Sequence, residues 1–518
     1  MLDLLAPRTY LLAMATPEST EQYFNRLKHQ GLPEHAIRTF GKTRFKICSI
    51  GFGGYRVHYN SFEHARALRY AMLNGINLID TSSNYTDGGS EMLIGNLLQE
   101  MIERGELNRD EVVVVSKVGY VQGQNLELAQ RVEAEGQPFS EMVKYMEGCW
   151  HCIHPDFLQD QLSRSLERLQ LPALDVYLLH NPEYFLSDLQ KRGERDVAAA
   201  REQYYLRIQK AFEWMEEKVA EGKIKGYGIS SNTFPGAADD FEFTSLEKVI
   251  AIAEYVASNN YFQVIQFPFN LYESGAALEK NQSHRSKTLL QLAQEKTLAT
   301  LVNRPLNAVS HNGMVRLASF RETDADAIAT SFSRQLHDLT ELESGFHSSF
   351  KARMPPEIPK QHFEEIFGRA TQLGDALNVY QNWQHWDHVR QTVLMPQTSA
   401  YLSYLHQKLE TDPEWQNWSA AYSKAFFAFL DTITRHYENS AQIFSEKIGY
   451  QLDNLLPELQ PSATLSQKTL RVLTATAGVH GVLLGMRRTP YVEDALAALK
   501  ADPLAGANNL LARFETKT

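Results

Sequence analysis

The stretch NLIDTSSNYTDGGSEMLIG, from Asn77 to Gly95, contains the pattern that decides the fold of this chain. A short apolar run ends at Asp80, and Tyr85 follows it, ahead of a glycine pair. An apolar run bounded by polar residues and glycines is typical of a buried β-strand. Because this strand ends in an acid with a phenol just beyond it, we interpret its carboxyl end as the rim of a ligand site.

Similar runs recur along the chain and alternate with longer amphipathic segments. Segments such as SFEHARALRYAMLNG and FLQDQLSRSLERLQ repeat apolar residues at spacings of three and four, as helices do. This alternation indicates a parallel sheet, and eight strands predict a closed (β/α)8 TIM barrel, an α/β fold. The predicted strands are ICSIGFG near Cys48, INLID ending at Asp80, EVVVVSK ending at Lys117, LDVYLLH ending at His180, IKGYGISS near Ser230, VIQFPF near Gln266, LATLVNRP near Arg304 and VHGVLLG ending at Gly485.

Composition narrows the class of protein. The 518 residues are 43% hydrophobic and 22% charged, which is typical of a globular chain with a large core. A formal net charge of −11 argues against a nucleic-acid partner, and no apolar run reaches the roughly 20 residues that span a membrane. Three cysteines cannot form a disulfide framework, so we expect a reducing, cytoplasmic location. The segment before Met14 lacks the basic region of a secretory signal, and we interpret Met14, rather than Met1, as the start of translation.

The predicted strand ends carry a chemically matched set of side chains. In TIM barrels the carboxyl ends of the strands form the active site, and here they carry Asp80, Lys117 and His180, with Tyr85 in the loop after the first. An ammonium favours the ionised form of a nearby phenol, so Lys117 would help Tyr85 to donate a proton. A neutral imidazole can orient a carbonyl oxygen. Asp80 and Lys117 alone would fit a structural ion pair equally well, but four such groups together favour catalysis.

Together, the segments DTSSNYTDGGSEMLIG, VVVVSKVG, DVYLLHNPE and GYGISSNTF resemble the aldo-keto reductases. The resemblance covers roughly residues 38–313 and resumes at about 465–499. It implies an NAD(P)H-dependent oxidoreductase that interconverts an alcohol and a carbonyl compound (aldehyde, ketone or sugar) by direct hydride transfer. By this resemblance Tyr85 is the general acid, Asp80 and Lys117 tune it, and His180 positions a small-molecule carbonyl substrate.

The resemblance also implies a nicotinamide nucleotide bound without a Rossmann domain. Carried over by position, Ser231, Asn232 and Gln266 would hydrogen-bond the nicotinamide carboxamide. Ser230 is an alternative to Ser231 because the serine is doubled. Arg304 lies where many members carry an aromatic residue that stacks on the nicotinamide, so we interpret it as a ligand of the pyrophosphate.

The stretch GVLLGMRRTPYVEDALAAL resembles the family's segment for the adenosine half of the cofactor. Arg487 and Arg488 stand where basic residues commonly meet a 2′-phosphate, and guanidinium groups bind phosphate in bidentate geometry. This favours NADP over NAD as the cofactor. Ala495 replaces the asparagine that usually contacts the adenine, with Asp494 just before it as the candidate contact.

Residues 310–467 lie between the seventh and eighth predicted strands, where typical members of the family have a much shorter connection. A connection of this length must have structure of its own, and we predict a helical subdomain on the catalytic face. It would cover the pocket, select a large substrate or contact another protein. MPPEIP, from Met354 to Pro359, would interrupt its helices. Its core or interface is predicted to include a helically spaced stripe of Trp415, Trp418, Tyr422, Phe426, Phe429 and Ile433.

The sequence predicts four regions of the chain. They are an N-terminal extension (1–37) whose helix covers the other end of the barrel, strands one to seven (38–309), the insertion (310–467), and strand eight with the cofactor segment (468–518). CWHCIH, from Cys149 to His154, has a metal-like spacing, but no second cluster completes a zinc site, so no metal is predicted. A barrel that binds its cofactor but acts as a regulatory or docking subunit is the alternative, and the complete tetrad favours the enzyme.

Overall fold

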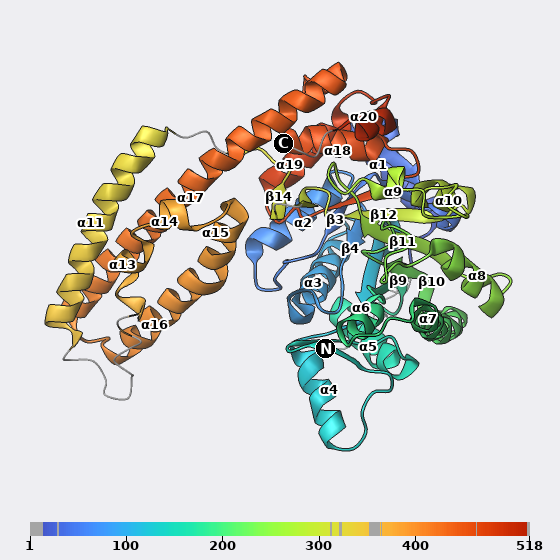
Figure 1. The fold of residues 1–518 in the computed structure, drawn as a ribbon, viewed down its shortest axis with the longest axis horizontal. Coiled ribbons are helices and arrows are strands. Elements are labelled where there is room, and N and C mark those ends of the chain that lie inside the picture. The colour runs from blue at the N-terminus through green and yellow to red at the C-terminus, as the bar shows by residue number, and fades with distance from the viewer. Residues whose placement is uncertain are drawn as a thin grey trace, which may run out of the picture. The chain divides into compact units, whose positions relative to one another are not determined.

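The computed structural model of the protein describes residues 14–27, 31–310, 313–320, 324–351, 363, 365–462 and 464–514. The chain divides into two compact units (Figure 1). Unit 1 comprises Met1–His311 and Leu452–Thr518, and unit 2 comprises Asn312–Gln451. The segment from Met354 to Pro359, which the sequence predicts to interrupt the insertion, lies outside the described residues.

Unit 1 contains the predicted barrel, so the fold class is confirmed. Eight parallel strands close in the order of the sequence, and the last of them, β15, pairs with both β12 and β3. The β-branched runs are buried along almost their whole length, as expected for strands covered on both faces. The barrel strands are β3 (Ile50–Gly53), β4 (Leu78–Asp80), β5 (Val113–Val118), β9 (Leu174–His180), β10 (Ile224–Ser230), β11 (Phe262–Pro268), β12 (Ala299–Asn303) and β15 (Gly481–Leu484).

Helices surround these strands (Figure 1). Several of them begin where a side chain accepts the first free backbone N–H groups, as Ser61, Asp196, Ser245, Thr288 and Thr464 do. The helices that alternate with the strands or follow the last one are α2 (Phe62–Leu73), α3 (Gly89–Glu103), α5 (Pro155–Leu169), α7 (Val197–Ala220), α8 (Leu246–Val256), α10 (Leu289–Glu295), α18 (Leu465–Ala475), α19 (Thr489–Lys500) and α20 (Ala507–Arg513).

The connection after β5 is long and has structure of its own. It contains helix α4 (Gln124–Ala134) and a small antiparallel sheet. The sheet joins β6 (Tyr120–Val121), β7 (Val143–Met146) and β8 (Cys149–His151), with β8 in the middle. Backbone hydrogen bonding between Cys152 and Gly119 ties the end of this connection to its beginning, close to the carboxyl end of β5.

The amino end of the barrel is closed differently from the prediction. Helix α1 spans only Pro17–Leu27, and the chain then forms an antiparallel pair, β1 (Ile37–Thr39) with β2 (Lys46–Cys48). Phe40 and Phe45 of this hairpin are fully buried in one cluster with residues that begin barrel strands. Helix α1 does lie at this end, where Arg26 pairs with Glu111 just before β5. It does not cover the end alone, because two aromatic side chains of the hairpin fill it.

Unit 2 is helical and has its own apolar core. The predicted aromatic stripe lies on α17 (Pro413–Leu455), and its members are fully buried except Trp418, which packs against the same core. The core also receives Phe332, Leu339 and Phe346 from α11 (Ala325–Ser349). Other α-helices in the described part of unit 2 are α13 (Arg369–Leu373), α14 (Ala376–Val379), α15 (Trp383–Val389) and α16 (Met395–Lys408). Although α17 is long, none of the helices in the described ranges is both long and apolar enough to cross a bilayer.

The boundary at which the chain returns to unit 1 differs from the predicted end of the insertion at residue 467. Unit 2 ends at Gln451, so residues 452–467 belong to unit 1. Asp453, in the last turn of α17, pairs with Lys468 of α18 at 2.6 Å. Arg471 of α18 donates to the Glu458 carbonyl and to the Ser462 hydroxyl, both at 2.8 Å. These contacts bind the segment to the barrel helices.

Candidate active site

The four candidate catalytic side chains meet at the carboxyl end of the barrel. β4 ends at Asp80, β5 carries Lys117, and β9 ends at His180. Lys117 Nζ donates to Asp80 Oδ2 at 2.7 Å and to the Tyr85 hydroxyl at 3.1 Å. The rings of Tyr85 and His180 meet edge to face with centroids 5.9 Å apart. The fold therefore brings together the four side chains that the sequence places at or just after separate strand ends.

The loop that carries Tyr85 is fixed by hydrogen bonds to the neighbouring strand. The backbone N–H groups of Thr81 and Ser83 donate to carbonyls of β5, at 2.8 and 3.1 Å. Lys117 Nζ donates to the Thr81 carbonyl at 2.8 Å. Tyr85 then begins a short 3-10 helix that leads into α3, and the other three residues of this helix, Thr86, Asp87 and Gly88, adopt positive φ angles. The same lysine thus anchors both the loop and the phenol.

Electrostatics favours a charged lysine beside a protonated phenol. Burial lowers the pKa of Lys117, but the adjacent Asp80 and Tyr85 outweigh burial, and the pKa of the ammonium is raised. Burial raises the pKa of Tyr85, and the Lys117 charge opposes this shift only in part. The ammonium acts in the predicted direction, but burial has the larger effect, so Tyr85 holds its proton at neutral pH. A phenol that keeps its proton until the substrate develops negative charge suits a general acid.

His180 is neutral and has one free ring nitrogen. Burial, with the charges of Lys117 and His151, holds the pKa of His180 well below its usual range. Its Nδ1 lies 3.1 Å from the Ser82 hydroxyl, and among the described residues Nε2 has no hydrogen-bond partner. His151 and the His180 carbonyl are hydrogen-bonded at 2.8 Å, and the Tyr120 ring packs on the imidazole with centroids 4.7 Å apart. These neighbours are not among the predicted site residues, although Ser82 lies in the stretch from Asn77 to Gly95 and His151 in the CWHCIH segment.

A second polar chain extends from Asp80 across the barrel. Gln266, in β11, donates from Nε2 to Asp80 Oδ1 at 2.8 Å. Ser230, the last residue of β10, donates its hydroxyl to Gln266 Oε1 at 3.1 Å. Of the two adjacent serines, Ser230 is therefore the one that contacts Gln266. The Ser231 hydroxyl is instead bonded to those of Thr233 and Thr244, each at 3.2 Å.

Glu183 is a buried acid in the loop after β9 that is not among the sequence-predicted site residues. Its Oε1 accepts the backbone N–H of Asn232 at 2.7 Å, whereas among the described residues Oε2 has no hydrogen-bond partner. Burial raises the pKa of Glu183 to about 7. The side chain of Asn232 itself is exposed. The sequence does contain a signal for this residue, because its carboxylate follows closely after the strand that ends at the candidate catalytic histidine.

The basic residues assigned to the cofactor lie after β12 and β15. Arg304, with a φ of 53°, donates to Glu273 Oε1 at 2.6 Å. Just before it, the buried Asn303 Oδ1 lacks a hydrogen-bond partner in the described part of the chain. After β15, Arg487 is half-buried and Arg488 is exposed, with its Nε 3.5 Å from Glu63 Oε2.

Asp494 has partners inside the protein. It accepts hydrogen bonds from Thr464 Oγ1 at 2.9 Å, Ser466 Oγ at 2.5 Å and Gln467 Nε2 at 2.9 Å. These residues begin α18, whose backbone cap is Thr464, so the carboxylate lies at the positive end of that helix and holds the side chains of its first turn. The position therefore has a structural role in addition to the adenine contact that the resemblance implies.

The thiols and imidazoles of the CWHCIH segment have separate roles and do not form one site. Cys149 and Cys152 are buried free thiols, and Cys152 Sγ donates to the Ser140 carbonyl at 3.4 Å. His154 caps the amino end of α5 through its side chain. Within the described ranges, no group of three or more His, Cys, Asp or Glu side chains is arranged to hold a metal ion.

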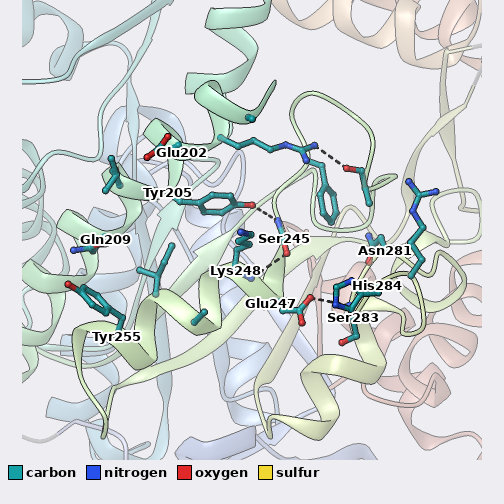
Figure 2. A pocket seen from close by; sticks show the side chains of 18 residues that line it. Glu202, Tyr205, Gln209, Ser245, Glu247, Lys248, Tyr255, Asn281, Ser283 and His284 are labelled. Atoms are coloured by element: carbon teal, nitrogen blue, oxygen red, sulfur yellow. Dashed lines mark hydrogen bonds between the residues drawn. The ribbon is translucent and has the colours of Figure 1, made fainter. Parts of the chain in front are cut away.

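A groove of about 830 Å³ lies between α7 and α8 (Figure 2). Tyr205 is one of its walls, and its hydroxyl accepts the Ser245 N–H at 2.9 Å. On the far side Glu247 accepts the Ser283 N–H at 3.2 Å (Figure 2). None of the residues that line the groove belongs to the tetrad or to the candidate cofactor contacts. The groove is therefore separate from the site described above.

Comparison with known proteins identifies the family of this chain. Residues 49–317 match the family model described as Aldo/keto reductase family, which is more than half of the chain. The protein therefore belongs to the aldo/keto reductase family. This confirms the resemblance that the sequence motifs indicate.

Individual relatives match shorter parts of the chain. Aldose reductase C of Dictyostelium discoideum is 25% identical over 215 residues, which cover 40% of this chain and 54% of that protein. D-arabinose 1-dehydrogenase of Saccharomyces cerevisiae is 33% identical over 117 residues, covering 23% of this chain and 26% of that protein. These matches thus span about half, or less, of the relatives' own length. A solved aldo/keto reductase from Klebsiella pneumoniae, in complex with NADP and acetate, aligns with a TM-score of 0.42 and 16% identity over 92% of this chain and 95% of that chain.

Proposed function

We propose that this protein is an NAD(P)H-dependent oxidoreductase that reduces an aldehyde, ketone or sugar carbonyl to an alcohol, with Tyr85 as the general acid. The observation that carries the proposal is the contact of Lys117 Nζ with both the Tyr85 hydroxyl and the Asp80 carboxylate, beside a neutral His180. A structural ion pair would not require a phenol at 3.1 Å or an imidazole with a free nitrogen.

The residues around the tetrad fit a nicotinamide nucleotide. The nicotinamide carboxamide has one acceptor and two donors, and the amide of Gln266 beside the Ser230 hydroxyl offers both kinds of partner. The buried Asn303 Oδ1, which lacks a partner in the described structure, is a further acceptor. Ser231 and Asn232 follow directly, as the family resemblance expects. These groups would hold the nicotinamide beside Tyr85.

The choice between the two nucleotides would depend on Arg487 and Arg488. Guanidinium groups after the last strand suit a 2′-phosphate, which only NADP carries. The relatives include an NADPH-dependent D-xylose reductase of Meyerozyma guilliermondii and an NADH-specific methylglyoxal reductase of Escherichia coli, so the family match does not decide the point. We propose NADP on the strength of the arginine pair, with Arg304 directed to the pyrophosphate.

The chain's own residues would perform the proton chemistry. When bound, the cofactor supplies the hydride that adds to the carbonyl carbon. His180 Nε2 would orient the carbonyl oxygen, and Tyr85 would give that oxygen its proton. Lys117 would stabilise the resulting phenolate until solvent returns a proton, and Asp80 would keep the lysine charged and in place. The alternative of a docking subunit with little turnover is not favoured, because no part of this proton chain is missing.

The proposal is tested by absorbance of the reduced nicotinamide during turnover of a panel of aldehydes, ketones and sugars. Tyr85→Phe should lower kcat on the order of 10²–10⁴-fold while cofactor affinity stays within a few fold, because only the transferred proton is lost. Tyr55→Phe is the matched control, since its ring packs on Tyr85 with centroids 5.3 Å apart but lies outside the proton chain. Turnover by Tyr85→Phe equal to that of the control would remove Tyr85 from the mechanism.

A further inference from the structure

Ser82 connects the candidate catalytic histidine to a chain of amides. Its side chain is fully buried, 3.1 Å from His180 Nδ1 and 2.7 Å from the side-chain oxygen position of Asn84. The Lys117 carbonyl, which also accepts the Ser83 N–H, lies 3.3 Å away and is a second, longer acceptor for the Ser82 hydroxyl. Asn84 continues the chain through its amide nitrogen to Gln122 Oε1 at 3.2 Å. No solvent reaches the hydroxyl, so these neighbours determine where its proton points.

A hydroxyl has one proton to donate, and this count links Asn84 to His180. If Ser82 donates to the Asn84 oxygen, or to the Lys117 carbonyl, it can only accept from His180, whose Nδ1 must then carry the proton. A neutral imidazole has one N–H, so Nε2 would be left as a bare acceptor. In that arrangement the imidazole could not donate to a carbonyl oxygen.

Exchanging the positions of the Asn84 side-chain oxygen and nitrogen reverses the direction of every hydrogen bond in this series. The amide nitrogen then donates to Ser82, Ser82 donates to His180 Nδ1, and Nε2 carries the proton. Gln122 follows by presenting its amide nitrogen to the Asn84 oxygen. The oxygen and nitrogen of a side-chain amide occupy the same places in both arrangements, so the change needs no movement of the backbone. Only the second arrangement gives the free Nε2 a proton for a carbonyl oxygen.

We propose that Ser82 and Asn84 are positioning residues that set the tautomer of His180, and that the reducing enzyme requires the arrangement in which Asn84 donates to Ser82. The mechanistic part of this inference rests on the proposed function. The part that concerns the tautomer does not, because it can be observed in the resting protein. No bond is made or broken in this step, and protons are only redistributed among fixed hydrogen bonds.

Substitutions at Asn84 separate this role from simple packing. Asn84→Asp replaces the amide by a carboxylate that can only accept, which forces Ser82 to donate away from His180. Asn84→Leu removes both amide groups and leaves Ser82 free to donate to His180 Nδ1. We expect kcat at pH 8 to fall on the order of 10²–10³-fold in Asn84→Asp, as for loss of one donor to a developing oxyanion, and at least tenfold less in Asn84→Leu. A packing role predicts the opposite order, because Asp is the closer match in shape.

Ser83, the residue after Ser82, offers a matched control for substitution of Ser82. Ser83 is also buried, and its hydroxyl has no hydrogen-bond partner in the described structure. Ser82→Ala and Ser83→Ala therefore remove the same atom from adjacent buried sites, and only the first touches the chain to His180. Ser82→Ala should lower kcat with little change in cofactor affinity, and Ser83→Ala should leave both unchanged.

The tautomer is measured directly by ¹⁵N NMR of the protein labelled at histidine, with the His180 signals assigned by their loss in His180→Gln. In Asn84→Asp, Nε2 should show the shift of an unprotonated ring nitrogen. In Ser82→Ala the populations of the two tautomers should differ from those in Ser83→Ala. Unchanged His180 signals in folded Asn84→Asp, or in Ser82→Ala if the first variant does not fold, would overturn the inference. If the signals move as expected but no carbonyl compound is reduced, the tautomer control stands and the proposed function fails.

Discussion

Replacing Glu183 by glutamine should change how the stability of the protein depends on pH. Glu183 is buried, and its pKa is raised to about 7 from an ordinary value of 4.5. The folded protein therefore holds this proton more firmly than the unfolded chain does. The stability from this group is fully present below pH 4.5 and is lost as the pH rises towards 7. Glutamine resembles the protonated acid in shape and charge, and its oxygen can still accept the Asn232 N–H.

The magnitude follows from the two pKa values. A difference of about 2.5 in pKa corresponds to about 3 kcal/mol, at about 1.36 kcal/mol per unit. Part of this stability is already lost at pH 5. The free energy of unfolding of Glu183→Gln, relative to that of the wild type, should therefore increase by about 2.5 kcal/mol between pH 5 and pH 8. The side chain is fully enclosed, so solvent does not screen the effect.

The assay is urea unfolding of wild type and Glu183→Gln at both pH values, compared as a difference in the free energy of unfolding. Taking the difference cancels the contributions of other titrating groups. One of these is Glu343 of unit 2, because burial raises its pKa to about 7 as well. Glu242→Gln is the control, because it removes a nearby but only half-buried carboxylate. A difference between Glu183→Gln and wild type that stays constant from pH 5 to pH 8 would refute the reasoning.

Two further predictions address the cofactor and the insertion. Replacing Arg487 and Arg488 together by alanine should weaken NADPH binding by roughly 2–4 kcal/mol and leave NADH almost unchanged, because only NADPH carries the 2′-phosphate. Fluorescence titration with both nucleotides checks this, and equal losses for the two would show that the pair does not bind the phosphate. Replacing residues 312–451 by a short Gly/Ser connection should preserve NADPH binding and reduction of a small aldehyde, since all four candidate catalytic residues lie in unit 1. Cooperative unfolding would first confirm that the shortened chain folds, and loss of small-aldehyde turnover in such a folded chain would show that unit 2 contributes to the site.

The barrel was predictable because each of its strands is a buried run with a strong apolar signal. Strand position then located Asp80, Lys117 and His180, since the ends of parallel strands converge whatever lies between them. The hairpin at the amino end was not predictable in the same way. Its strands span three residues each, which is too short for any periodic pattern.

The finer contacts depend on partners that are distant in the sequence. Arg304 pairs with Glu273, and Asp494 accepts hydrogen bonds from the start of α18, about 30 residues earlier. The end of α17 contacts α18 of unit 1 through the Asp453–Lys468 ion pair, whereas the helical pattern of α17 continues without a break across the boundary. The role of Ser82 depends on the direction of a hydroxyl proton, which no sequence pattern encodes.

The order in which the barrel is closed has a consequence for biosynthesis. β12 ends at Asn303, and its neighbour β15 begins only at Gly481. At roughly 5–20 residues per second, a ribosome takes on the order of 10–35 s to make the chain between them. During that time seven strands have emerged, and the edges of β3 and β12 that β15 later joins have no partner. Unpaired edges are templates for pairing with other chains, so the nascent protein is prone to aggregation during this interval. Slowing translation within the codons for unit 2 should therefore increase aggregation of newly made protein without changing the stability of the finished molecule.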